Sequence, residues 1–125
     1  MRVEHWLIGP QLIGLIFMIM GYIQKRFPPK HINGLYGYRM PSAMKNQQTW
    51  DEANGFSARY MIRLGVIMIA VGIASVVCLE QINMKEDTRM GLLAALLVVS
   101  SMTMAVLLIM GTEKHMNKVF DNKPL

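Results

Sequence analysis

Three runs of this chain contain no Asp, Glu, Lys, Arg or His, and they constrain the fold more than any other feature. They cover residues 6–23, 64–79 and 91–111. A bilayer core needs roughly 20 apolar helical residues, usually about 17 to 25, so the first and third runs are long enough to span it. The second run reaches that length when it starts at residue 61, because the aliphatic stem of Arg63 can extend toward the headgroups. The pattern predicts three transmembrane helices, at about 6–23, 61–79 and 91–111.

A soluble helical core and a cleaved signal peptide are the alternatives to membrane spans. Buried helices of soluble proteins normally keep a polar face at a period of 3.6 residues, whereas these runs are apolar all round. The 125-residue chain is also 53% hydrophobic, which is too apolar for an ordinary soluble domain. No A-x-A-like site follows the first run, and a basic border ending in Pro28 and Pro29 does. We therefore expect an uncleaved first span.

The distribution of charge predicts the orientation. Six basic residues and two acidic ones lie between residues 24 and 60, and the positive-inside rule places this segment in the cytoplasm. Residues 80–90 carry three acidic and two basic residues and suit the outside, and the lysines after Gly111 return the tail to the cytoplasm. The expected fold is an all-α membrane protein with its N-terminus outside, its C-terminus inside and an ordered cytoplasmic loop, residues 24–60, between the first two helices.

A few polar and small residues within the runs predict helix contacts. We expect the hydroxyls of serine and threonine to bond back to their own helix backbone, whereas the longer Gln11 amide predicts an interhelical contact. Ala70 with Ala74, and Ser101 with Ala105, have the spacing that lets helix backbones approach closely. The hydroxyl side chains concerned are those of Ser75, Ser100, Ser101 and Thr103.

Metal binding and catalysis have little support. Thirteen methionines suit copper(I), but residues two apart on a helix, such as Met18 and Met20, point to different sides. No cluster of Cys or His accompanies them, so gap-filling and lipid-facing methionine is the better interpretation. The single cysteine, Cys78, cannot form an internal disulfide. No run contains an acid–base pair of the kind found in ion paths, so neither a metal, a cofactor nor a stand-alone transporter is expected.

The connector between the first two runs has the signals of an ordered loop. Pro28 and Pro29 end the first helix, because neither supplies a backbone N–H. Asn33 with Gly34 predicts a turn, and Gly37 predicts a backbone conformation that other residues avoid.

The next helix starts near one of two candidate caps. Thr49 followed by Glu52 matches a capping box, and Asn46 is a rival cap three residues earlier. From either start the helix runs into the second span. Four residues then share one face of this helix because they recur at intervals of four, three and four: Trp50, Asn54, Ser57 and Met61.

Membrane anchoring and nucleic-acid binding are two other interpretations of the loop. Its aromatic residues suit an interfacial belt, with the lysines and arginines attracted to anionic lipid. That interpretation leaves its asparagines, glycines and Pro41 unexplained. Six basic residues on a connector between two membrane spans are too few to indicate nucleic-acid binding, so no direct nucleic-acid binding is expected.

Nine residues of the loop and the following helix form a spaced motif. They are Asn33, Gly37, Tyr38, Arg39, Pro41, Ser42, Asn46, Trp50 and Asn54, called the loop motif below. Their spacing resembles the signature of the SdpI family of bacterial integral membrane proteins, in which a similar motif lies between the first two helices of a three-helix unit. Met40 departs from the pattern, because many relatives have Thr there.

The resemblance implies a non-enzymatic, multi-pass protein of the bacterial inner (cytoplasmic) membrane. It implies immunity against a secreted peptide toxin, or signalling through a cytoplasmic regulator protein, beside contact with membrane lipids. Whether the chain forms an oligomer is left open. Competing functions are a structural subunit of a larger membrane complex and a protein that handles lipids or small molecules. Catalysis is not expected, because His31, Asp51 and Glu52 form no known constellation.

The loop motif is a candidate site for a partner or an anion, and Arg39 is its central residue. A guanidinium held beside Ser42 and Asn46 can fork onto a carboxylate or phosphate. The alternative is internal, with Arg39 tying the loop to backbone carbonyls at a helix end.

Overall fold

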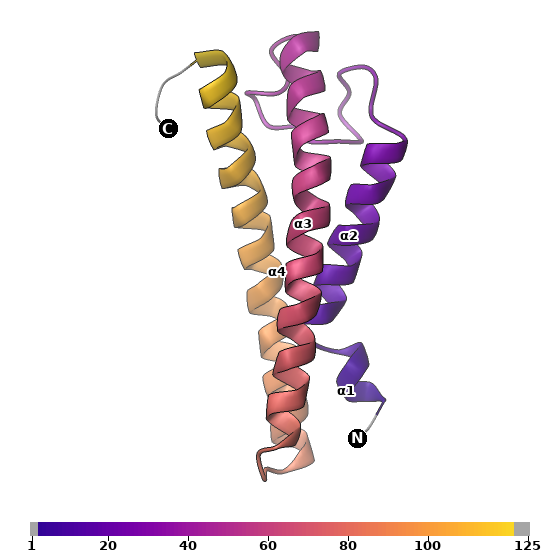
Figure 1. The fold of residues 1–125 in the computed structure, drawn as a ribbon, viewed down its shortest axis with the longest axis vertical. Coiled ribbons are helices and arrows are strands. Elements are labelled where there is room, and N and C mark those ends of the chain that lie inside the picture. The colour runs from indigo at the N-terminus through magenta and orange to yellow at the C-terminus, as the bar shows by residue number, and fades with distance from the viewer. Residues whose placement is uncertain (1–2, 122–125) are drawn as a thin grey trace.

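The computed structural model describes residues 3–121, and all regular structure in that range is helical. Figure 1 shows α2, α3 and α4 as an elongated bundle, with α1 at one end and the long loop wrapped around the start of α3 at the other. The end with α1, where α3 turns into α4, is called the hairpin end below. The end with the long loop is called the loop end. The predicted all-α fold is confirmed. The elements are α1 (Glu4–Leu7), α2 (Pro10–Arg26), α3 (Gln47–Glu80), α4 (Glu86–Met116) and the π-helical turn η1 (Asn117–Asp121).

Two helices within the described residues are long and apolar enough to cross a membrane: α3, and α4 with its continuation to Phe120. Only 22% of the most apolar stretch of α3 and 17% of that of α4 are buried. The core helix of a soluble protein is mostly buried, so this exposure favours a lipid environment. Both helices therefore have the character of membrane helices, and they contain the predicted spans at 61–79 and 91–111.

The predicted first span, residues 6–23, is not one continuous helix. The backbone leaves the helical path at Ile8 and Gly9, where Gly9 takes a φ of 150°, and α2 begins at Pro10. Pro10 has no N–H to continue a helix from α1 and restricts the residue before it, and only glycine adopts this backbone conformation readily. The remaining helix has 17 residues, the lower limit for spanning a bilayer. It ends at Arg26, directly before Phe27 and the two prolines, as predicted.

Glycines bring α2 and α3 into close contact. A Cβ on Gly65 would lie 2.6 Å from the carbonyl oxygen of Gly14, and one on Gly21 would lie 2.8 Å from that of Ala58. Such separations leave no room for a side chain, so the two backbones touch. The predicted small-residue pairs do not have this role, because Ala70, Ala74 and Ala105 are exposed. Small size permits close packing, but only the position on the helix decides whether a neighbour is there.

The polar side chains within the apolar helices behave largely as predicted. Each of the four hydroxyls considered in the sequence donates to the carbonyl four residues earlier in its own helix: Ser75, Ser100, Ser101 and Thr103. Gln11 lies against Gly72 of α3, but its amide makes its hydrogen bonds at the other side, to the short α1 and the break after it. Its Nε2 donates to the carbonyls of His5 and Trp6, at 3.3 and 3.0 Å, and so caps the break between α1 and α2.

A histidine between two carboxylates fixes the hairpin end. The buried His5 bonds through Nδ1 to Glu80 of α3 and through Nε2 to Glu86 of α4. Arg89 pairs with the second oxygen of Glu86 at 3.0 Å. The hydrogen bond to Glu86, with a smaller contribution from Glu80, raises the pKa of His5 against the opposing effect of desolvation. This cluster docks α1 onto α3 and α4. It was not predicted from the sequence.

Candidate functional site

The loop leaves α2 through an asparagine turn. The Asn33 side-chain oxygen accepts from the backbone N–H groups of Leu35 and Tyr36, at 2.9 and 2.8 Å, which confirms the predicted turn. The Tyr36 hydroxyl then donates to the carbonyl of Phe27 at 2.6 Å. These bonds fold the first part of the loop back onto the end of α2.

Asn54 of α3 is the centre of the site. Its Oδ1 accepts from the Tyr38 backbone N–H at 2.6 Å, and its Nδ2 donates to the Trp50 carbonyl at 3.0 Å and the Tyr38 carbonyl at 3.4 Å. Gly37 passes directly over this amide with a φ of 105°, and a Cβ there would lie 2.5 Å from Oδ1. Glycine is therefore needed for both its conformation and its lack of a side chain. The Asn54 side chain thus hydrogen-bonds to both the N–H and the carbonyl of Tyr38, as the backbone of a neighbouring β-strand would.

Gln24 connects the same centre to α2. This buried amide donates through Nε2 to the Asn54 carbonyl at 3.0 Å and to the Ser57 hydroxyl at 2.9 Å. This role of Gln24 was not predicted from the sequence. Its polar character at the end of an apolar run was the signal that could have identified it.

Trp50 anchors the loop from below. Its ring is fully buried, and its indole Nε1 donates to the carbonyl of Pro29 at 2.7 Å. The tryptophan packs with Tyr38, Ala43 and other residues of the described chain in a small core beneath the loop. Trp50 and Tyr38 thus pack inside the protein instead of serving as an interfacial belt. The predicted shared face is also confirmed, because all four of its residues are buried.

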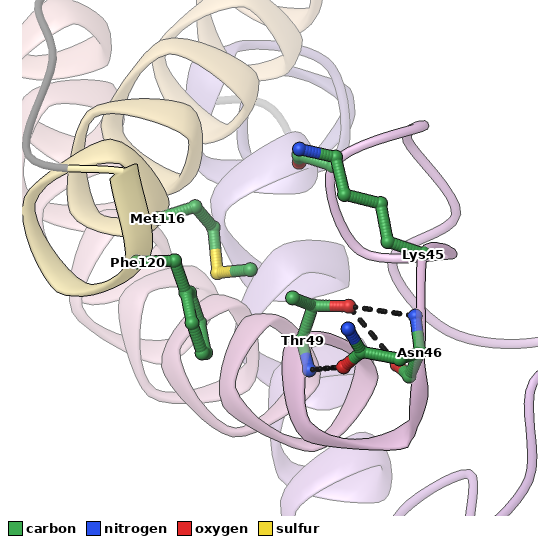
Figure 2. Close-up of a pocket in the computed structure, with 6 residues that line it drawn as sticks. Lys45, Asn46, Thr49, Met116 and Phe120 are labelled. Atoms are coloured by element: carbon green, nitrogen blue, oxygen red, sulfur yellow. Dashed lines mark hydrogen bonds between the residues drawn. The ribbon is translucent and has the colours of Figure 1, made fainter.

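Asn46 is the cap that starts α3. Its side chain accepts from the Thr49 backbone N–H at 2.9 Å, and the Thr49 hydroxyl accepts from the Asn46 backbone N–H at 3.1 Å. Figure 2 shows this reciprocal pair, a capping box in which threonine takes the place of the usual Glu or Gln. The alternative start at Thr49 with Glu52 is wrong, because the helix already begins at Gln47.

Glu113 of α4 joins the loop to the last helix. One of its carboxylate oxygens accepts from both the Tyr38 hydroxyl and the Ser42 hydroxyl, each at 2.8 Å. Burial, with the nearby carboxylate, raises the pKa of Tyr38, so its hydroxyl remains a donor. Sequence analysis did not find Glu113, although it is the first acidic residue after the third apolar run.

A second contact ties α4 to α3 at the same end. His115 lies 2.7 Å from a carboxylate oxygen of Glu52, and its ring stacks on Phe56 with centroids 4.0 Å apart. Glu52, predicted as part of a cap, instead pairs across helices.

Arg39 lies on the outside of this interlocked loop. It is exposed, and its Nη1 donates to the carbonyl of Gly34. No hydrogen bond joins it to Ser42 or Asn46 among the described residues, so the expected cradle of these three side chains is not formed. Pro41, two residues further along the loop, is exposed as well. The loop motif therefore divides into residues that hold the loop and an outward-facing pair.

Two cavities lined by described residues adjoin the loop. The smaller, about 160 Å³, is the one in Figure 2 and lies between the loop and the end of α4; it is lined by Ser42, Lys45, Asn46, Thr49, Met116 and Phe120. The larger, about 500 Å³, lies under the loop between α2 and α4 and is called the α2–α4 cavity. In the described part of the chain, no group of three or more His, Cys, Asp or Glu side chains is placed to hold a metal ion.

Fold and site together define an all-helical protein in which a non-helical loop is locked onto the start of a membrane helix. The model of the SdpI/YfhL protein family matches residues 30–112, which include the loop motif, all of α3 and most of α4. The chain belongs to the SdpI/YfhL protein family.

One relative is the protein YfhL of Bacillus subtilis (strain 168). It is 43% identical over 60 residues, which are 48% of this chain and 54% of that protein. The match thus spans about half the length of each. No solved structure matches the chain.

Proposed function

We propose that this protein crosses the bacterial cell membrane three times, with α2, α3 and α4 as its spans and the loop end in the cytoplasm. The positive charge of residues 24–60 and of the end of α4 supports this orientation. The short α2 spans by virtue of its close packing on α3 and of the basic residues that end it, Lys25 and Arg26, which extend to the headgroups.

Within that membrane the protein acts without catalysis, in immunity against a peptide toxin or in signalling through a partner that binds the cytoplasmic loop. One observation carries this proposal: the loop is held from inside by Asn54, Trp50 and Glu113, while Arg39 remains at the surface. A guanidinium on a fixed support loses less conformational freedom when it binds a carboxylate. The arrangement therefore favours recognition of an acidic group on a partner.

The experiment is a resistance assay with matched variants. Wild type, Arg39→Ala and Arg59→Ala are expressed in a sensitive bacterial host and challenged with a panel of secreted bacterial peptide toxins. Arg59 is the control because it is an exposed arginine of α3 outside the loop motif. Arg39→Ala is expected to lose protection or the co-purified partner at unchanged membrane abundance, and Arg59→Ala to keep both. If the two variants gave equal protection and retained the partner equally, Arg39 would have no specific part in the function.

A structural role in a larger membrane complex is the second candidate. The exposed apolar surface of α4, with Val98, Met102 and Met110 each about 60% exposed or more, favours it. Crosslinking in native membranes with identification of the products separates the candidates. Recovery of lipid contacts alone would count against the assembly role.

A further inference from the structure

The α2–α4 cavity opens at the protein surface beneath the loop. Its volume of about 500 Å³ lies within the range of roughly 300–1,000 Å³ that holds small molecules. Met20 of α2 and Ile109 of α4 line it and are themselves exposed. Figure 1 shows α2 and α4 on opposite sides of α3 at this end. The cavity is therefore accessible from the side of the bundle, where lipid surrounds a membrane protein.

The depth of the cavity along the helices matches the edge of the hydrocarbon. Met20, Met61 and Leu108 line it, and each lies close to the loop end of the apolar run of its own helix. Apolar runs end where the bilayer core gives way to headgroups. The cavity thus lies where an acyl chain joins the headgroup of a phospholipid.

The side-chain donors of Gln24 and Tyr38 in its inner wall are already paired. Gln24 donates to Ser57 and Asn54, and the Tyr38 hydroxyl donates to Glu113. Methionines supply much of the remaining wall, and their flexible side chains adapt to an apolar occupant. Binding of a chain of methylene groups would therefore leave these hydrogen bonds intact.

The mouth carries positive charge. Arg39 lines the cavity, and its bond to the Gly34 carbonyl uses one Nη1 donor of a guanidinium that has five N–H groups. No Asp or Glu of residues 3–121 lines the cavity, and the last turn of α2 adds Lys25 and Arg26 near this end. This distribution of charge is complementary to a phosphate at the headgroup level.

We propose that the α2–α4 cavity binds an anionic phospholipid, with one acyl chain between α2 and α4 and the phosphate at Arg39. The inference goes beyond the proposed partner binding, and it shares with that proposal both the membrane placement and the use of Arg39. Lipid in the cavity would support Tyr38 and the loop above it from the membrane side. The composition of the membrane then affects how firmly the loop is held.

Native mass spectrometry of the delipidated full chain tests this site. The protein is titrated with phosphatidylglycerol or with diacylglycerol of identical acyl chains, which lacks the phosphate. One phosphatidylglycerol is expected to bind on the order of tenfold more tightly than diacylglycerol, the effect of one charged hydrogen bond. Arg39→Gln is expected to remove this preference. Leu108→Trp fills the cavity and is expected to lose both lipids, whereas Leu107→Trp, on the exposed face of α4, keeps them.

Three outcomes overturn the proposal. Equal affinity of wild type for the two lipids excludes the headgroup contact, and lipid binding by a folded Leu108→Trp variant at the wild-type level excludes the cavity. If that variant does not fold, Ile109→Trp replaces it, and the exposed Arg39→Gln tests the headgroup without changing the core. Retention of a leucine-rich helical peptide in place of either lipid would identify a peptide site. Lipid binding is measured on purified protein and toxin resistance on cells, so the two results are independent. Lipid binding can be absent while resistance is observed, and resistance can be absent while lipid binds.

Discussion

Replacing Asn54 with alanine is expected to release the loop from α3. The substitution leaves the buried Tyr38 backbone N–H, now 2.6 Å from Oδ1, without an acceptor. A buried unsatisfied donor costs about 1–3 kcal/mol. The Trp50 carbonyl loses the Asn54 side-chain donor but remains part of the helix, so its contribution to the lost stability is smaller. With the loss of packing at a residue that is 3% exposed, the total comes to about 2–4 kcal/mol of unfolding free energy.

The assay is unfolding in mixed micelles with increasing sodium dodecyl sulfate, followed by tryptophan fluorescence. Trp50 is the buried reporter, and a Trp6→Phe background removes the other tryptophan. Gln48→Ala is the matched control, because Gln48 is exposed in the same first turns of α3; it should change stability by less than about 0.5 kcal/mol. Equal midpoints for Asn54→Ala and Gln48→Ala would refute the reasoning that this amide holds the loop.

Three more substitutions follow from the structure. Gly37→Ala places a Cβ against the Asn54 amide at a strained φ and should cost about 1–3 kcal/mol, whereas Gly34→Ala, with open space around its Cβ, should be tolerated in the same assay. Gly65→Ala should force α2 from α3 and lower thermal stability in detergent, and Gly91→Ala, also open, should not; equal melting temperatures would count against backbone contact. The raised pKa of His5 means that its contribution to α1 docking is fully present below pH 6.5, the unfolded value, and is lost as pH rises through the folded value. Limited proteolysis of the N-terminal segment should therefore accelerate at high pH, and a pH-independent rate, or the same dependence in His5→Gln, would disprove this.

Features that depend on nearby residues could be predicted from the sequence. The end of α2 before Pro28, the Asn33 turn and the conformation of Gly37 all follow from the residue and its immediate neighbours. The buried face that begins at Trp50 follows from helical periodicity alone. The Gly9-Pro10 pair is a local signal for the break before α2, although it lies within an apolar run long enough for a continuous span.

Contacts between distant segments could not be predicted in this way. Tyr38 and Glu113 are 75 positions apart, as are His5 and Glu80. Periodicity states which residues share a face, but it does not state which face meets another helix. The close packing in fact involves Gly14 and Gly65 instead of the predicted alanine and serine pairs. Periodicity alone could not distinguish these small residues.

The orientation of the loop is the central claim, and cysteine labelling measures it most directly. In a Cys78→Ala background, the exposed positions Lys85, Arg39 and Lys118 are replaced singly by cysteine and treated with a membrane-impermeant maleimide. With the loop end in the cytoplasm, Lys85→Cys is expected to be labelled in intact cells, and Arg39→Cys and Lys118→Cys only after permeabilisation. Labelling of Lys118→Cys but not of Lys85→Cys in intact cells would contradict this orientation.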